Sequence, residues 1–180
     1  MLMKGKTALV TGAANGIGSE IARLFCEQGA RVWLLDKDEK QLNAMTNSLR
    51  EQGAQADLCV ADVTKPREIE GAIAQIHKQI DGLDVLVNNA GIYPRRQFLE
   101  MEEADWLTVL DVNLNSAYRC TRLVVPQMVQ LRRGKVIQIS SVTFHWGLKH
   151  LTHYVASKGA LIGFTRSLAR ELGEFNVHVN

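Results

Sequence analysis

Short runs of apolar residues alternate along the chain with longer stretches in which apolar residues recur every three or four positions. The short runs have near-continuous apolar centres (ALV, VWLL, LCVA and VLV), which is typical of parallel strands covered on both faces. They predict strands at Lys6–Thr11, Arg31–Asp36, Gln55–Ala61, Asp84–Asn88, Lys135–Ser141 and Asn176–Asn180. The longer stretches predict helices at Gly16–Gln28, Glu39–Glu51, Pro66–Ile80, Glu103–Leu131 and Thr152–Leu172.

This strict alternation of strand and helix predicts one architecture. Parallel strands joined by right-handed helical crossovers form an open sheet with helices on both faces. We therefore predict an α/β fold, a Rossmann-like doubly wound parallel sheet, in a single domain over residues 1–180. Proline inside a helix removes a hydrogen bond, so Pro126 should kink the helix predicted at Glu103–Leu131.

Composition excludes several classes of protein. Hydrophobic residues make up 46% of the chain and charged residues 22%, which excludes a disordered chain. The net charge of +2 is too small for an electrostatic nucleic-acid binder, and no apolar run is long enough to cross a membrane. Cys26, Cys59 and Cys120 are too widely spaced for a disulfide framework or a zinc motif. With a strand pattern directly after the first residues and no signal peptide, we expect a cytoplasmic protein with reduced cysteines.

A glycine-rich turn, TGAANGIG at Thr11–Gly18, joins the first predicted strand to the first helix. Its glycines let the backbone approach a ligand closely, and the helix that follows points free N–H groups at an anion such as a pyrophosphate. Asp36 ends the second strand, 18 residues after Gly18, where a carboxylate accepts hydrogen bonds from an adenosine ribose. This carboxylate would repel a 2′-phosphate and favours NAD over NADP, although the neighbouring Lys37 partly offsets the repulsion.

The spacing of Tyr154 and Lys158 predicts the reacting groups. Four residues apart on a helix, the two side chains share one face. A free tyrosine titrates near pH 10, and an adjacent ammonium group favours the phenolate that a general base requires. Ser141 ends the fifth predicted strand, 13 residues before Tyr154, and a loop can bring its hydroxyl to an oxygen on which charge develops.

These motifs, together with NNAG at Asn88–Gly91, resemble the short-chain dehydrogenases/reductases, and the resemblance extends over essentially all 180 residues. It implies a catalytic set of Asn113, Ser141, Tyr154 and Lys158, in which Asn113 of DVNLN supports a proton relay to the lysine. It implies that NNAG steadies the sheet beside the nicotinamide ribose and that Asp62 and Val63 contact the adenine, although Asp62 alone would suggest a helix cap. The implied cofactor contacts are Thr11, Gly12, Asn15, Gly16, Ile17, Gly18, Asp36, Lys37, Asp62, Val63, Asn89, Ala90, Gly91, Tyr154 and Lys158.

The loop after Ser141 flanks the substrate in that family. Its aromatic residues suggest an aromatic or cyclic alcohol, and the implied substrate contacts are Ser141, Tyr93, Trp146, His153 and Tyr154. The loop also carries the pattern H-x4-H-x2-H at His145, His150 and His153. Without a carboxylate partner this pattern favours pocket lining or plain loop residues over a metal site. Arg95 and Arg96 are expected to be solvated rather than bound to a substrate anion.

The resemblance implies an oxidoreductase that interconverts a secondary alcohol and a ketone with NAD, or with NADP. It implies a small-molecule substrate and a homodimer or homotetramer paired through the two long helices. One alternative is an NADPH-dependent 3-oxoacyl-carrier-protein reductase, which Asn15, in place of a basic residue before Gly16, mildly disfavours. The other is a truncated, non-catalytic nucleotide-binding module. Family members continue past a strand like NVHVN into a substrate-covering segment and a last strand, so we expect the carboxyl end to be incomplete.

Overall fold

Six parallel strands form one sheet in the computed structural model, which describes residues 1–180. The strands lie in the order β3-β2-β1-β4-β5-β6, so the chain reverses its direction of progress across the sheet between β1 and β4. This is the Rossmann-like doubly wound fold that the alternation predicted. The strands are β1 (Thr7–Thr11), β2 (Arg31–Asp36), β3 (Ala56–Val60), β4 (Val85–Asn88), β5 (Gly134–Gln138) and β6 (Val177–Val179).

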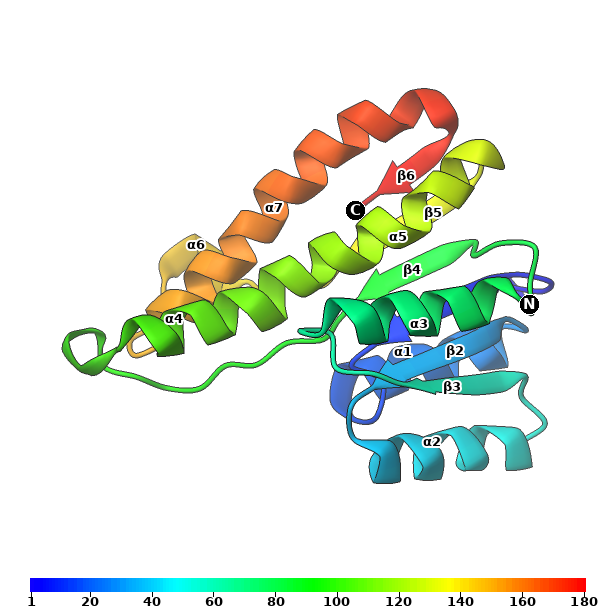
Figure 1. Ribbon diagram of the computed structural model, residues 1–180, viewed down its shortest axis with the longest axis horizontal. Helices are drawn as coiled ribbons and strands as arrows, with labels where there is room; N and C mark the ends of the chain where they lie inside the picture. Colours follow the sequence, from blue (N-terminus) through cyan, green and yellow to red (C-terminus); the bar gives the residue numbers. More distant parts are fainter.

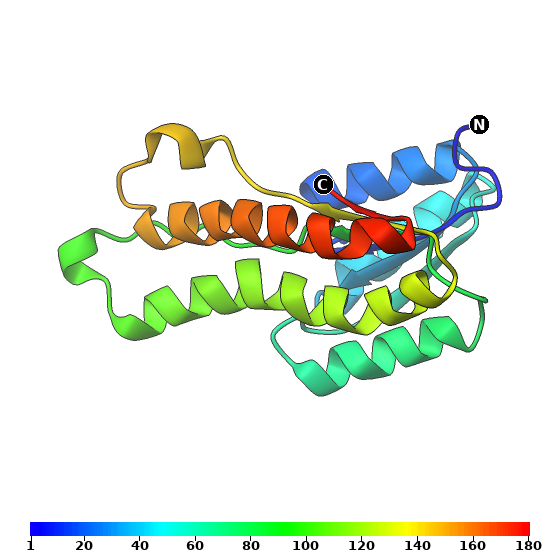
Figure 2. The same cartoon turned by 90° about the horizontal axis from the view of Figure 1, so that it is seen from above.

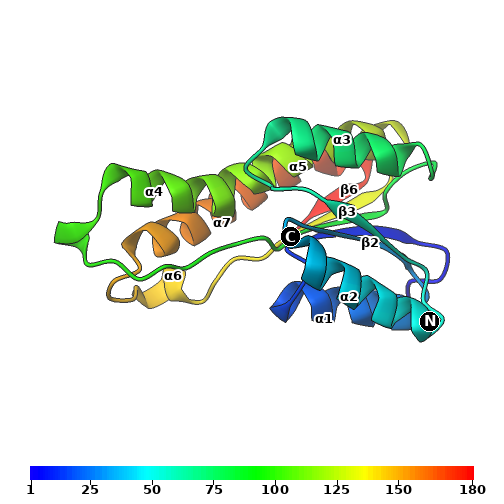
Figure 3. The same cartoon turned by 60° about the horizontal axis from the view of Figure 1, so that its bottom comes forward.

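Helices cover both faces of the sheet, as Figures 1 and 3 show. A cluster of 14 buried residues lies between the sheet and α1 and α2, and a cluster of 19 lies under α3, α5 and α7. Beyond the carboxyl ends of the strands, α4 and α6 extend the molecule together with the start of α7 (Figure 2). The α-helices are α1 (Gly16–Glu27), α2 (Glu39–Glu51), α3 (Pro66–His77), α4 (Glu103–Leu110), α5 (Ser116–Gln130), α6 (Thr143–Trp146) and α7 (Thr152–Leu172).

The helix predicted at Glu103–Leu131 differs from the structure in one respect. It is continuous along α4 and α5, but residues Asp111–Asn115 form a π-helical turn. Pro126 lies within α5 without ending the helix, and the kink predicted at this residue stays a prediction. A π turn inserts one residue into the helical repeat and re-aims the side chains on either side of it. The short helix α6 was not predicted, and none of the helices is both long and apolar enough to cross a bilayer.

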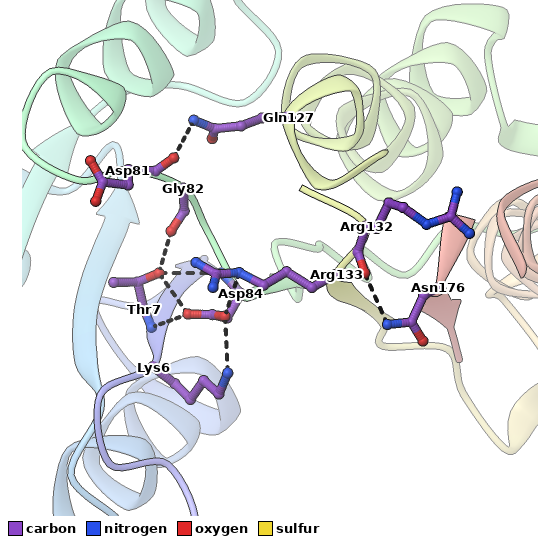
Figure 4. Close-up of polar contacts among 9 residues, drawn as sticks. All are labelled: Lys6, Thr7, Asp81, Gly82, Asp84, Gln127, Arg132, Arg133 and Asn176. Atoms are coloured by element: carbon purple, nitrogen blue, oxygen red, sulfur yellow. Dashed lines mark hydrogen bonds and ion pairs between the residues drawn. The ribbon is translucent and has the colours of Figure 1, made fainter. Parts of the chain in front are cut away.

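A charged cluster ties the sheet together at the end opposite to the carboxyl ends of the strands (Figure 4). The Asp84 carboxylate, at the start of β4, accepts hydrogen bonds from the Thr7 amide nitrogen at 3.0 Å and from the Thr7 hydroxyl at 3.2 Å. Lys6 Nζ lies 3.2 Å and Arg133 Nε 3.4 Å from the same carboxylate, which is only 10% exposed. Asp84 therefore joins the starts of β1, β4 and β5, the strands that surround the reversal point.

We expect Asp84→Ala to lower the free energy of unfolding by about 2–4 kcal/mol, because it removes a shielded carboxylate that holds several donors. Asp81→Ala is the matched control. Asp81 accepts a hydrogen bond from Gln127 only through its backbone carbonyl, which the substitution keeps, so this variant should change stability by less than about 0.5 kcal/mol. Urea unfolding of both variants measures the difference. Equal stability of the two variants would contradict the role given to Asp84.

Candidate functional site

A cleft of about 690 Å³ opens at the carboxyl ends of the strands. Residues after β1, β2, β3, β4 and β5 line it, and it therefore lies at the point where the strand order reverses, the usual ligand site of such sheets. A second hollow, of about 400 Å³, lies at the other end of β2 and β3. Its charged residues Arg31, Arg50 and Asp57 are paired with one another, and none of the predicted catalytic residues lies there. The first cleft is the candidate functional site.

The glycine-rich turn forms one wall of this cleft. Gly12 has φ +63°, and a Cβ at this residue would lie 2.8 Å from the Ala90 Cα atom. A Cβ at Gly18 would overlap the Gly12 carbonyl oxygen, so neither position has room for a side chain. The Asn15 side chain does not cap α1, which leaves the first N–H groups of the helix available to an anion. The turn therefore fits the pyrophosphate of a dinucleotide.

Side chains of the predicted NNAG stretch brace this turn. The Asn89 side-chain amide donates to the carbonyl oxygens of Thr11 at 3.0 Å and Gly12 at 3.1 Å. The buried Thr11 hydroxyl accepts from the amide nitrogens of Asn89 and Ala90, both at 3.1 Å. The ends of β1 and β4 are thus locked side by side. Thr11 and Gly18 act from beneath the surface, while Asn89, Ala90 and Gly91 line the cleft itself.

Asp36 lies at the end of β2, next to the start of the glycine-rich turn. Its carboxylate accepts from the Ala14 amide nitrogen at 3.1 Å and, through the other oxygen, from the Asp38 amide nitrogen at 3.1 Å. These bonds fix the carboxylate in the wall of the cleft. The Lys37 ammonium is exposed and lies 4.0 Å from an Asp62 carboxylate oxygen, so it is not bound to Asp36.

Asp62 and Val63 follow β3 and line the same end of the cleft. One Asp62 carboxylate oxygen accepts from the Thr64 amide nitrogen at 2.9 Å and from its hydroxyl at 2.8 Å. Burial raises the pKa of Asp62, but the bonds from Thr64 and the charge of Lys37 outweigh this effect, so that its pKa is lowered. The residue before α3 is Lys65, so Asp62 closes the loop ahead of that helix and does not cap it.

Tyr154 and Lys158 come together at the opposite end of the cleft. Both belong to α7 and line the cavity, and the Lys158 Nζ atom lies 6.0 Å from the centre of the Tyr154 ring. Lys158 is only 4% exposed, and its ammonium donates to the Ile139 carbonyl oxygen at 2.6 Å. Burial lowers the pKa of Lys158 to about 8. A desolvated cation therefore stands beside a tyrosine that faces the cleft.

Asn113 lies in the π-helical turn between α4 and α5 and is 1% exposed. Its side-chain oxygen accepts from the Ile92 amide nitrogen at 2.8 Å, and its nitrogen donates to the Ile92 carbonyl and to the Ser157 hydroxyl, both at 3.0 Å. Asn113 thus connects the segment after NNAG to α7, one residue before Lys158. All the hydrogen-bonding groups of its side chain have partners except one acceptor lone pair.

The two serines after β5 have different surroundings. Ser140 lines the cleft, and its hydroxyl donates to the Lys158 carbonyl oxygen at 2.7 Å. The Ser141 hydroxyl lies 2.9 Å from the Thr143 hydroxyl, and Ser141 is not part of the cleft wall. The catalytic role of Ser141 stays a prediction. The sequence pattern did not indicate Ser140 as a residue of the cleft.

The predicted substrate residues separate into exposed and buried ones. Tyr93 lines the cleft, with its ring centre 6.1 Å from that of Tyr154, and Trp146 is exposed on α6. His153, in contrast, has no exposed surface and does not line the cleft. A side chain in this position does not contact a substrate, so that prediction for His153 is wrong. Arg96 pairs with Asp105 at 3.2 Å.

Other cleft residues carried no recognisable signal in the sequence. Ile139 acts through its backbone carbonyl, which any residue provides. Thr108 on α4 and Val112 in the π-helical turn also line the cleft. Thr64 had a weak signal, because a hydroxyl two residues after an aspartate often closes a turn.

Comparison with known proteins places these features in a wider group. A model of the short chain dehydrogenase family matches residues 6–180. The chain is 36% identical over 180 residues to a 3-oxoacyl-acyl-carrier-protein reductase of Thermotoga maritima, covering 100% of this chain and 73% of the relative. A solved structure of a putative gluconate dehydrogenase from Agrobacterium tumefaciens has a TM-score of 0.96 at 34% identity, covering 99% of this chain and 70% of that one. An actinorhodin polyketide ketoreductase variant, solved with NADPH, has a TM-score of 0.94 at 37% identity, covering 97% and 68%.

Proposed function

The chain belongs to the short-chain dehydrogenase family, whose members are oxidoreductases that use NAD(P), and from this premise we propose that it interconverts a secondary alcohol and a ketone with NAD. When bound, the dinucleotide supplies the group that accepts or donates the hydride. The observation that carries the proposal is the buried Lys158 ammonium beside Tyr154, at one end of a cleft whose other end holds the glycine-rich turn and Asp36.

Tyr154 is the general acid and base in this proposal. During oxidation, the Tyr154 oxygen takes the proton of the substrate hydroxyl, and during reduction it returns a proton to the carbonyl oxygen. Lys158 stabilises the phenolate electrostatically, because burial leaves its charge poorly screened by water. Its bond to the Ile139 carbonyl oxygen aims the ammonium, and leaves two further N–H donors for a ribose hydroxyl.

Ser141 and Asn113 assist Tyr154 in different ways. We assign the Ser141 hydroxyl to the substrate oxygen, where its hydrogen bond strengthens as charge develops. This assignment requires the hydroxyl to exchange its present partner, Thr143, for the substrate. We assign Asn113 to the relay that carries the proton of Tyr154 to and from solvent by way of Lys158, and its bonds to the Ile92 carbonyl and the Ser157 hydroxyl support this assignment.

The cofactor preference follows from Asp36. Two backbone bonds hold its carboxylate in the cleft wall, where one lone pair on each oxygen stays free for the hydroxyls of an adenosine ribose. A 2′-phosphate placed there would meet a fixed negative charge. The similarity to a ketoreductase solved with NADPH favours the opposite preference, and Lys37 is the only cation beside Asp36 that could serve it.

We expect Asp36→Ala to shift the ratio of kcat/KM values from NAD toward NADP by at least about tenfold, because a like-charge contact costs several kcal/mol. Steady-state kinetics with both cofactors measures the ratio. Lys37→Ala is the matched control and should shift the ratio in the other direction, or leave it unchanged. An unaltered ratio in Asp36→Ala would remove the basis for preferring NAD.

Turnover on a panel of substrates tests the proposed reaction. The panel should contain aryl, cyclic, sugar-acid and acyl-thioester ketones, each followed by NADH and NADPH absorbance on protein of verified mass. Preference for the acyl thioester would favour the second candidate, a 3-oxoacyl-carrier-protein reductase, to which the similarity with the Thermotoga maritima enzyme points. Dinucleotide binding without turnover of any member would instead indicate a non-catalytic binding module.

We also propose that the protein forms a homodimer or homotetramer in the cytoplasm. The exposed side chain of Leu107 on α4 supports pairing through α4 and α5. Light scattering of the purified protein measures the state directly.

A further inference from the structure

The catalytic helix α7 begins without the usual capping group. Its N-cap residue is Leu151, which has no side-chain acceptor, and the first N–H groups of any helix lack partners inside the helix. Tyr154 is the third residue of α7, so its own N–H is one of these groups. The proposed general base therefore stands at a position of the backbone where a helix usually frays.

His153 supplies the missing acceptor. Its Nδ1 atom accepts a hydrogen bond from the Tyr154 amide nitrogen at 2.9 Å, and the ring has no exposed surface. Because Nδ1 accepts, the proton of the neutral imidazole resides on Nε2, which is buried without a partner. The unpaired Nε2–H group costs free energy because it is buried. The hydrogen bond from the Tyr154 amide to Nδ1 offsets part of this cost.

The peptide group on the other side of Tyr154 is held in the same way. The Ser157 hydroxyl donates to the Tyr154 carbonyl oxygen at 2.7 Å and accepts from the Asn113 side chain at 3.0 Å. Side chains thus fix both the N–H and the C=O of the residue that carries the reacting oxygen. Asn113 and Ser157 hold the Tyr154 carbonyl from the side of the π-helical turn, and His153 holds the Tyr154 amide.

Burial, and not the charged groups around it, favours the neutral form of His153. Burial lowers its pKa, while the Asp105 carboxylate on α4 and the Leu151 carbonyl oppose this effect without reversing it. Asp105 already pairs with Arg96, at 3.2 Å. A protonated ring would present an N–H where Nδ1 now accepts and would break the bond to Tyr154.

We propose that His153 is a positioning residue. It supplies the side-chain acceptor that the N-cap residue Leu151 lacks, and it holds the backbone of Tyr154 through Nδ1. The inference rests on the proposed function, because Tyr154 must be the proton-transfer group for its placement to matter. His153 acts on the rate of proton transfer and leaves dinucleotide binding to the glycine-rich turn.

Three substitutions separate this role from simple packing. His153→Leu keeps much of the volume without an acceptor, and should lower kcat about tenfold to a hundredfold while the Kd for NADH stays within about twofold. The Asn side chain places an oxygen close to the position of Nδ1, so His153→Asn should recover most of kcat. His153→Gln places its oxygen nearer to Nε2 and should not. Equal kcat in the Leu and Asn variants, or wild-type kcat in the Leu variant, would overturn the proposal.

A second measurement on the unmodified protein does not depend on activity or on folding of the variants. Long-range proton–nitrogen NMR should find Nδ1 of His153 bare and Nε2 protonated at neutral pH. A protonated Nδ1 would overturn the contact with Tyr154. If the tautomer is as expected but the wild-type protein turns over no member of the substrate panel, the proposed function fails while the structural contact holds.

Discussion

Tyr154→Phe should lower kcat by about a thousandfold or more and leave the Kd for NADH nearly unchanged. The substitution removes one oxygen atom, and in our proposal this oxygen is the only group that exchanges a proton with the substrate. The ring itself is preserved, so its contact with Tyr93 and its position beside Lys158 are retained. Stopped-flow kinetics with a ketone that the wild-type protein reduces measures kcat, and NADH fluorescence titration measures the Kd.

Tyr118→Phe is the matched control for this experiment. Tyr118 is exposed on α5, outside the cleft, and its loss of a hydroxyl should change kcat by less than about twofold. Retention of most turnover in Tyr154→Phe would remove Tyr154 from the proton-transfer step. Loss of NADH binding together with turnover would instead mean that the hydroxyl serves the cofactor site.

The sequence placed some residues of the cleft next to one another through local rules. A spacing of four residues on a helix brings Tyr154 and Lys158 onto one face wherever that helix packs. The glycine-rich turn also follows a local rule, because Gly12 adopts a φ of +63°, a value that strongly favours glycine, and α1 begins at Gly16 within this turn. Strand order then brings the ends of β1, β2 and β4 together, which places Asp36 and Asn89 beside this turn.

The parts that were missed depend on tertiary contacts. The π-helical turn at Asp111–Asn115 accompanies bonds from Asn113 to Ile92 and Ser157, which lie far apart in the sequence. Local helix propensity contains no information about such partners. Pro126 lies within α5 without ending the helix, and the adjacent Val124 and Val125 pack in the core cluster under α3, α5 and α7.

His153 and the two serines show how one residue of register decides a role. Successive residues leave a strand on opposite sides, so a boundary placed at Ser141 instead of Gln138 does not establish which serine faces the cleft. On α7, Tyr154 faces the cleft while His153, one position earlier, turns into the protein interior. The start of this helix also separates the three histidines of the loop pattern, since His145 and His150 are exposed and His153 is buried.

Lys158→Met should lower kcat by about a hundredfold to ten-thousandfold, since the phenolate of Tyr154 loses its only neighbouring cation. Methionine fills a similar volume, and the side chain stays buried. The variant also leaves the Ile139 carbonyl oxygen without its donor, which costs about 1–3 kcal/mol at every pH. Activity alone therefore does not separate an electrostatic effect from a loss of stability.

The pH dependence of stability makes that separation. Burial lowers the pKa of Lys158 from 10.5 to about 8, so between these values the unfolded chain binds the proton that the folded protein has released. The stability of the wild-type protein relative to Lys158→Met should therefore rise by about 3 kcal/mol as the pH increases from below 8 to above 10.5. Urea unfolding at several pH values measures this difference, in which the titration of all other groups cancels.

Lys135→Met, at an exposed lysine of β5, should show a constant difference across the same range. A constant difference for Lys158→Met as well would mean that the folded protein keeps this ammonium hydrated, and the poorly screened charge on which the proposed mechanism depends would be absent.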